Sequence, residues 1–224
     1  MMKLHYSAVS PYVRKVMVVA HELELLDRIE IVRSPVQMIT PNFALMKDNP
    51  IGKVPTLVLA DGTALFDSTV ICDYLDHLSG TPTLHPTHPD RRWRSMRWHI
   101  LGVNMADIML LWFRENLRPP EKRMKELHDI FELKLRASIP FLEQEAPALA
   151  RTPFCIGQIA IACALDYLDL RFPHIAWRDG NTAISRWFAS TIARTSFKLT
   201  DPRLAVVPPV TDGAVRQQAA QRAS

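Results

Sequence analysis

The chain has 224 residues, of which 48% are hydrophobic and 22% charged, and its formal net charge is +4. This hydrophobic share is ample for a buried core and excludes a disordered chain, while no apolar run approaches the roughly 20 residues of a membrane-spanning helix. The basic residues are scattered apart from one cluster, Arg91, Arg92, Arg94 and Arg97. We interpret that cluster as a solvated helix face, so neither nucleic acid nor a membrane is expected as a partner.

The cysteines and histidines point to a reduced protein without a metal site. Cys72, Cys155 and Cys163 are odd in number, form no CxxC pair and fall inside predicted helices, as reduced core residues of a cytosolic protein do. No signal-like apolar region follows Met1, so a cytoplasmic location is expected. The eight histidines are dispersed, and we expect no bound metal.

The first third of the chain alternates strand and helix patterns. Ser10 is a preferred N-cap, and Pro11 suits the first position of a helix that continues to about Leu25. Apolar alternation or helical spacing predicts a strand at 4–6, a second strand at 27–32 and a short helix at about 42–47. Two strands at 56–59 and 64–66 follow, joined by an Asp61-Gly62 hairpin turn. Ser68 is then expected to cap a third helix that runs to Leu78.

From residue 88 onward the patterns are helical. Helices are predicted at 90–115, 121–145, 158–172 and 181–193, and the third of them is apolar nearly all round, as a buried central helix is. We therefore expect a domain at 1–79, a turn-rich linker at 80–87, an all-α domain at 88–203 and a disordered, proline-interrupted tail at 204–224.

The segment GKVPTLVLADGTALFDSTVICDYL resembles the second half of the thioredoxin-like, glutathione-binding domain of glutathione S-transferases. That family has a cis-proline after a valine and an acidic residue followed by serine at the start of the third helix, and the matching residues are Val54-Pro55 and Asp67-Ser68. The resemblance implies an α/β thioredoxin-like N-terminal domain followed by an all-α domain, and a homodimer that binds glutathione.

The same resemblance assigns roles in glutathione binding. The backbone of Val54, beside Pro55, would pair with the cysteinyl part of glutathione as an added strand does. Asp67 would meet the γ-glutamyl ammonium, and Ser68 with the helix N-terminus would meet the α-carboxylate. Lys53 would meet the glycine carboxylate, or it is a solvated turn lysine. Without the upstream Val-Pro pair, Asp67-Ser68 would be interpreted as a plain helix cap.

Ser10 is the candidate catalytic residue. Ser10-Pro11-Tyr12-Val13 stands where glutaredoxins carry Cys-Pro-Tyr-Cys, and without those sulfurs thiol-disulfide exchange is not expected here. The start SPYVRK is similar to that of bacterial, Ser-type transferases, in which the serine hydroxyl donates to the glutathione sulfur. Ser10 is then either this donor or a helix cap only. Tyr6 is the rival donor, unless its ring serves packing.

The second domain resembles the family more loosely. Cys155 and Gln158 replace the hydroxyl and acid of the family's capping box, a change that affects stability rather than activity. The electrophile pocket is expected between the domains, although a Met/Trp stripe at helical spacing is usually core. Its candidates are Tyr12, Asn104, Ile108 and Trp112. Asp107 is a candidate contact to glutathione across the dimer interface.

The resemblance implies a glutathione transferase that activates the glutathione thiol for attack on a small hydrophobic electrophile. The alternative is a non-catalytic relative that binds glutathione or a protein. A glutathione-dependent peroxidase or dehalogenase would use the same site, and the sequence does not separate these activities.

Overall fold

The computed structural model describes residues 1–80 and 83–204, and its N-terminal part is built on a four-stranded mixed sheet. The strands are β1 (Met2–Tyr6), β2 (Ile29–Arg33), β3 (Thr56–Val58) and β4 (Ala64–Leu65), in the order β2-β1-β3-β4. β1 pairs with β2 in parallel and with β3 antiparallel. The β3–β4 hairpin turns at Gly62, whose φ of +89° glycine adopts without steric strain. This sheet confirms the predicted fold class for the first part of the chain.

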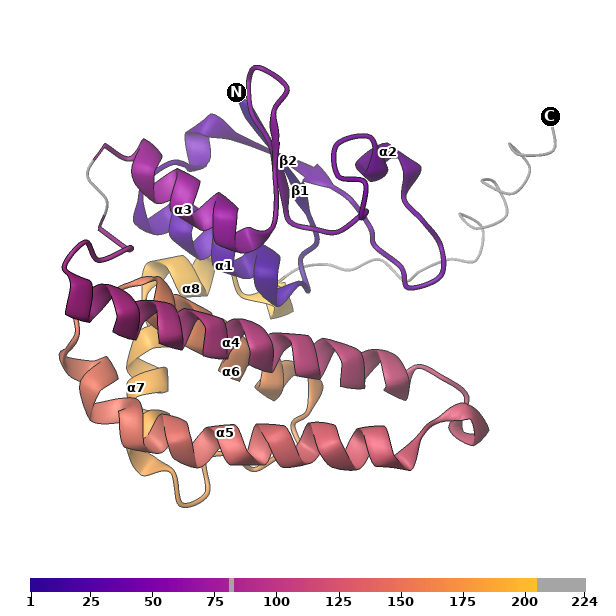
Figure 1. Cartoon of the computed structure of the whole chain (residues 1–224), viewed down its shortest axis with the longest axis vertical. Helices are drawn as coiled ribbons and strands as arrows, with labels where there is room; N and C mark the ends of the chain where they lie inside the picture. The colour runs from indigo at the N-terminus through magenta and orange to yellow at the C-terminus, as the bar shows by residue number, and fades with distance from the viewer. Residues whose placement is uncertain (81–82, 205–224) are drawn as a thin grey trace.

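Three helices accompany the sheet: α1 (Pro11–Glu22), α2 (Phe43–Met46) and α3 (Ser68–Leu78). α1 and α3 pack against each other and bury aliphatic residues that belong to one core with β1 and β3. α1 lies at the junction with the helical part of the molecule, as Figure 1 shows. Its N-terminus is therefore held between the sheet and the helices that follow.

The rest of the described chain is helical, with α4 (Pro89–Asn116), α5 (Lys125–Arg151), α6 (Ile156–Arg171), α7 (Thr182–Ile192) and α8 (Thr195–Leu199). α6 is buried continuously over residues 156–168, which confirms the prediction of a central helix. α4 and α6 approach closely because glycine stands at two crossing points. A Cβ on Gly102 would lie 2.5 Å from the carbonyl carbon of Ala160, and one on Gly157 would lie 2.5 Å from the Ser95 oxygen.

The connection between the two parts is anchored by Asp76 of α3. Its carboxylate accepts hydrogen bonds from the backbone N–H groups of Thr83, Leu84 and His85 and from the His85 ring. Ile156, the first residue of α6, donates its N–H to the Leu84 carbonyl. The turn-rich segment predicted as a linker is thus fastened to elements on both sides.

Several predicted boundaries were wrong, each for a local reason. Asp67, not Ser68, caps α3, because its carboxylate accepts from the Thr69 N–H at 2.8 Å while Ser68 is already helical. α1 ends at Glu22 rather than near 25. The predicted helix at 121–145 is shifted: a 3₁₀ turn occupies Pro120–Lys122, and α5 begins at Lys125 and continues through Pro147 to Arg151. α8 and the 3₁₀ turn at Pro202–Leu204 were not predicted.

The cysteines are free and buried, as expected, although Cys155 stands at the N-cap of α6 rather than inside a helix. Gln158 accepts from the Cys155 N–H and donates to the carbonyls of Leu149 and Thr152, so it joins the end of α5 to the start of α6. The arginine cluster at 91–97 is exposed, as expected of a solvated face. Residues 205–224 of the predicted disordered tail lie outside the described residues.

Candidate active site at the start of α1

Ser10 forms the N-terminal cap of α1. Its backbone is extended (φ −83°, ψ 121°), its Oγ accepts a hydrogen bond from the Val13 N–H at 3.3 Å, and Pro11 takes the first helical position. The hydrogen bond expected of Ser10 as a helix cap is therefore present. It uses only an acceptor lone pair, and a hydroxyl also has one proton to donate. Ser10 is partly exposed, so a bound thiolate could receive that proton while the cap persists.

The Val54–Pro55 bond is cis, as the resemblance implied. The turn before it is fixed by the buried Asn49, whose amide donates to the Lys53 carbonyl and to the Thr56 hydroxyl. Within residues 1–80 and 83–204, neither the N–H nor the C=O of Val54 takes part in a hydrogen bond. The backbone at Val54 is therefore free to pair with an extended peptide.

Asp67 and Ser68 differ in exposure. Asp67 is exposed, and its cap bond to Thr69 uses only Oδ1, so Oδ2 remains for an ammonium group. Ser68 is buried at the first position of α3, where the free backbone N–H groups of a helix favour an anion. Lys53 is exposed in its turn, which suits both of its predicted roles.

Tyr6 ends β1 and is partly buried. Burial raises the pKa of its phenol above the ordinary value, and the charge of Arg33 offsets only part of this rise. A serine hydroxyl is less acidic than this phenol, so acidity does not decide between Ser10 and Tyr6, and both stay candidates for the donor.

A hydrogen bond joins two predicted site residues from different elements. The Tyr12 hydroxyl, from the first turn of α1, donates to Oδ1 of Asp107 on α4. Burial, and then the bond and charge of Asp107, raise the pKa of Tyr12. Asp107 is exposed, so its second oxygen can still meet another group.

The remaining pocket candidates on α4 differ in how far their side chains are buried. Asn104 is exposed, and Ile108 is partly buried against the core. Trp112 is 4% exposed, stacks on Phe172 with ring centroids 4.6 Å apart, and donates its ring N–H to His128 at 3.3 Å. The core alternative therefore explains Trp112, and we do not retain it as a pocket residue.

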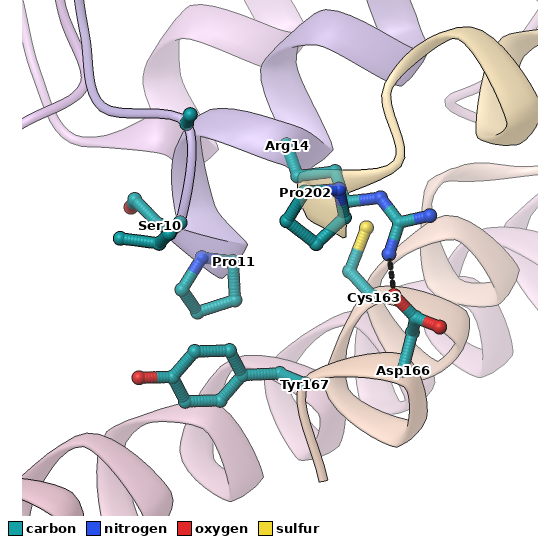
Figure 2. Close-up of a pocket in the computed structure, with 9 residues that line it drawn as sticks. Ser10, Pro11, Arg14, Cys163, Asp166, Tyr167 and Pro202 are labelled. Carbon is teal, nitrogen blue, oxygen red and sulfur yellow. Dashed lines mark hydrogen bonds and ion pairs between the residues drawn. The ribbon is translucent and has the colours of Figure 1, made fainter. Parts of the chain in front are cut away.

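Figure 2 shows a small cavity beside Ser10. The Ser10 side chain and the Tyr167 hydroxyl lie on one side of it, with an ion pair between Arg14 and Asp166 on the other. Pro11, Cys163 and Pro202 complete the labelled wall. A second cavity follows the same helix and is lined by Tyr12, Lys15 and Val103 among others.

Two charged residues of α1 that the sequence did not single out fix Ser10 relative to the helical part. Arg14 pairs with Asp166 of α6 and donates to the Phe197 carbonyl at 3.2 Å. Lys15 is 2% exposed, and its Nζ lies 2.8 Å from Nε2 of His99 on α4. Burial lowers the pKa of both groups, and with the Lys15 charge added the pKa of His99 falls to about 3. His99 is therefore neutral, and its Nε2 accepts a hydrogen bond from the Lys15 side chain.

The glutathione S-transferase N-terminal domain model matches residues 9–78. A glutathione transferase family member from Pseudomonas fluorescens Pf-5, with glutathione bound, is 38% identical, with 89% of this chain and 98% of that chain covered and a TM-score of 0.86. The chain belongs to the glutathione S-transferase family. A Pseudomonas fluorescens Pf-5 structure with S-(propanoic acid)-glutathione is 36% identical, covering 90% and 100% of the two chains, with a TM-score of 0.83. The uncharacterized GST-like protein YibF of Escherichia coli K12 is 27% identical over 207 residues, 90% of this chain and 98% of that protein.

In the part of the chain that the structure describes, no helix is long and apolar enough to cross a membrane. The same described residues bring together no set of three or more side chains suited to hold a metal ion.

Proposed function

We propose that the protein is a glutathione transferase of the Ser type, which binds glutathione along Val54 and Asp67 and activates its thiol at Ser10. The observation that carries this proposal is the state of the Ser10 hydroxyl, which accepts the cap bond from Val13 and keeps its proton available. The open backbone at Val54 and the exposed carboxylate of Asp67 support it, since they suit the middle and the γ-glutamyl end of glutathione.

In the proposed reaction, Ser10 and the N-terminal amides of α1 stabilise the glutathione thiolate and so lower the pKa of the thiol. The thiolate sulfur then forms a bond to the electrophilic carbon of a small, largely apolar substrate. Tyr12 and Ile108 would contact the apolar part of that substrate. Lys53 and Ser68 would hold the two carboxylates of glutathione.

The relatives support glutathione as co-substrate, because the Pseudomonas fluorescens structures hold glutathione and S-(propanoic acid)-glutathione. We also propose a homodimer in the cytoplasm. The large apolar side chains exposed on α3 and α4, Val70, Trp93 and Met96, support the dimer. Asp107 would then contact glutathione from the partner subunit through the oxygen that Tyr12 does not use. The free cysteines fit a reducing compartment.

Replacement of Ser10 tests the catalytic proposal. A hydrogen bond to a charged group is worth about 1.5–3 kcal/mol, so Ser10→Ala should raise the pKa of the bound thiol by about 1–2 and lower turnover of a chloronitrobenzene electrophile. Thiolate absorbance against pH measures the first effect. Ser10→Gly is the control, because glycine keeps most of the capping stability but has no hydroxyl.

The two variants separate catalysis from capping. Both should raise the pKa of the bound thiol equally, while Ser10→Ala alone should lower the melting temperature. If bound glutathione titrates identically in wild type and both variants, Ser10 is only a cap, and Tyr6 is the next residue to replace. Glutathione binding without turnover of the chloronitrobenzene, of a hydroperoxide or of a haloalkane would instead indicate the non-catalytic alternative.

A further inference from the structure

Two arginines at the C-terminal ends of α4 and α6 have no assigned role. Arg114 is in the last turn of α4, and Arg171 ends α6 one turn after Tyr167, which lines the cavity with Ser10. Burial raises the pKa of Tyr167, and the charges of Arg171 and Arg114 act in the opposite direction. Arg114 also acts on the Tyr12 phenol. Arg171 thus adjoins a tyrosine that lines the cavity with Ser10, at 5.7 Å from its ring centroid, and the charge of Arg114 acts on the same tyrosine.

The Arg171 guanidinium is held in place by aromatic rings. It lies 4.2 Å from the centroid of the Phe113 ring and 5.7 Å from that of Tyr167. Its Nε is buried and has no hydrogen-bond partner among the described residues. A planar fork that is already immobilised loses little freedom when it binds a carboxylate, and Arg–carboxylate pairs are among the strongest hydrogen-bonded contacts.

These two charges are not neutralised by the protein. Within residues 1–80 and 83–204, no carboxylate lies at ion-pair distance from Arg114 or Arg171. Two acids of the site have other partners: Asp107 accepts from Tyr12 through one oxygen, and Asp166 pairs with Arg14 and Arg203. The site thus has two positive charges without a carboxylate partner among the described residues.

We propose that the electrophile carries a carboxylate, which Arg171 and Arg114 bind while the apolar part of the molecule rests against Tyr12 and Phe113. This inference rests on the proposed transferase function and names its substrate class. The carboxylates of glutathione itself are assigned to Ser68 and Lys53, so the two arginines remain for the second substrate.

The two positive charges would also assist the reaction. An α,β-unsaturated carboxylate reacts slowly with a thiolate because both reactants are negative. The guanidinium groups offset this repulsion and draw charge toward the carboxylate end. The sulfur then bonds to the β-carbon, the π-electron pair moves to the α-carbon, and the α-carbon takes a proton from water.

Binding of two matched conjugates tests the inference without turnover. S-(2-carboxyethyl)glutathione and S-(2-carbamoylethyl)glutathione differ only in a carboxylate and an amide of nearly the same shape. Calorimetry on the full chain should show the acid binding about tenfold to 100-fold more tightly than the amide. Arg171→Met, which retains an apolar stem over Phe113, should remove most of this preference and leave the affinities for the amide and for glutathione unchanged. Arg114→Met should reduce it less.

Two further variants serve as controls. Arg186→Met removes an exposed arginine of α7 and should change none of the three affinities. Arg171→Lys keeps the positive charge but lacks the planar guanidinium, so its preference for the acid over the amide should be intermediate. Thermal melting of each variant shows whether its fold is intact.

Equal affinity of wild type for the acid and the amide would overturn the inference. An equal loss of affinity for glutathione, the acid and the amide in Arg171→Met would also overturn it, because Arg171 would then bind glutathione itself or stabilise the fold. The glutathione titration reports separately on the proposed function. If glutathione binds and the conjugates are not distinguished, only the substrate class is wrong; if glutathione does not bind, the transferase proposal fails as well.

Discussion

The Arg14–Asp166 ion pair provides the sharpest test of how the N-terminal end of α1, which bears Ser10, is held. Both side chains are 6% exposed. Removing one partner of a buried pair leaves the other charge uncompensated and costs about 3–5 kcal/mol. Asp166→Leu would leave Arg14 with only the Phe197 carbonyl. Arg14→Met would leave Asp166 with the two bonds from Arg203, each at 3.1 Å.

The structure therefore predicts unequal losses from the two single substitutions. We expect Asp166→Leu to cost roughly 3–5 kcal/mol and Arg14→Met to cost less, by about 1.5–3 kcal/mol, because the Arg203 bonds to a charged group persist. At about 2–4 °C per kcal/mol for a chain of this size, the Asp166→Leu variant should melt roughly 6–20 °C lower. The double variant should recover much of the loss, since apolar residues of similar volume often replace a buried ion pair without cost.

Urea unfolding followed by far-ultraviolet circular dichroism would measure these four stabilities. A double-variant loss equal to the sum of the single losses would show that the two residues do not interact. Asp166→Leu costing under about 1 kcal/mol would refute the view that Arg14 depends on this carboxylate. A fall in turnover of the folded double variant would show that the polar pair also orients Ser10.

Three further outcomes are expected. Asp67→Ala should weaken glutathione binding about tenfold or more, because the γ-glutamyl ammonium loses its counter-charge; unchanged affinity by calorimetry would remove this part of the site. Gly102→Ala should destabilise the chain by about 1–3 kcal/mol or more, since its Cβ would meet the Ala160 backbone at 2.5 Å, and an unchanged melting temperature would contradict the close α4–α6 packing. Burial alone would raise the pKa of Asp76, but its bonds from the His85 ring and three backbone N–H groups lower it overall, so its contribution to stability is present above about pH 4 and is lost as pH falls through the lower, folded pKa. Asp76→Asn should therefore be less stable than wild type at neutral pH and should lose less stability on acidification, as pH-dependent urea unfolding would show.

The sequence predicted those parts of the fold whose signals are local. Hydrophobic spacing identified the strands and the helices up to α7, and the Val-Pro and Asp-Ser pairs indicated a candidate glutathione site through the family resemblance. The cap of α3 was assigned one residue late because serine and aspartate are equally good caps, and only the backbone shows which carboxylate or hydroxyl meets the free N–H. The predicted helix at 121–145 ended too early, because α5 continues through Pro147 to Arg151. There the packing of the flanking residues outweighs the one lost N–H.

The contacts that position the site could not be predicted in the same way. Arg14 and Asp166 are 152 residues apart in the chain, and nothing in SPYVRK distinguishes a surface arginine from one that will be buried against α6. Trp112 and Ile108 have the same helical spacing, yet one completes an aromatic core cluster and the other is only partly buried. Whether a side chain on one helix face is buried depends on which residues of the neighbouring helix pack against it. A single sequence does not show that packing.

The arrangement of charge around α1 connects the proposed site with its proposed substrate. Arg14 is neutralised by Asp166, and Lys15 is paired with a neutral histidine deep between α1 and α4, so neither is available to a ligand. Arg114 and Arg171, in the last turns of α4 and α6, have no carboxylate at ion-pair distance among the described residues. The cations of α1 thus fasten the helix that bears Ser10, while these two keep an unpaired charge. A thiolate formed at Ser10 would face an electrophile whose negative end is drawn away from the sulfur, and that orientation exposes the reactive carbon to attack.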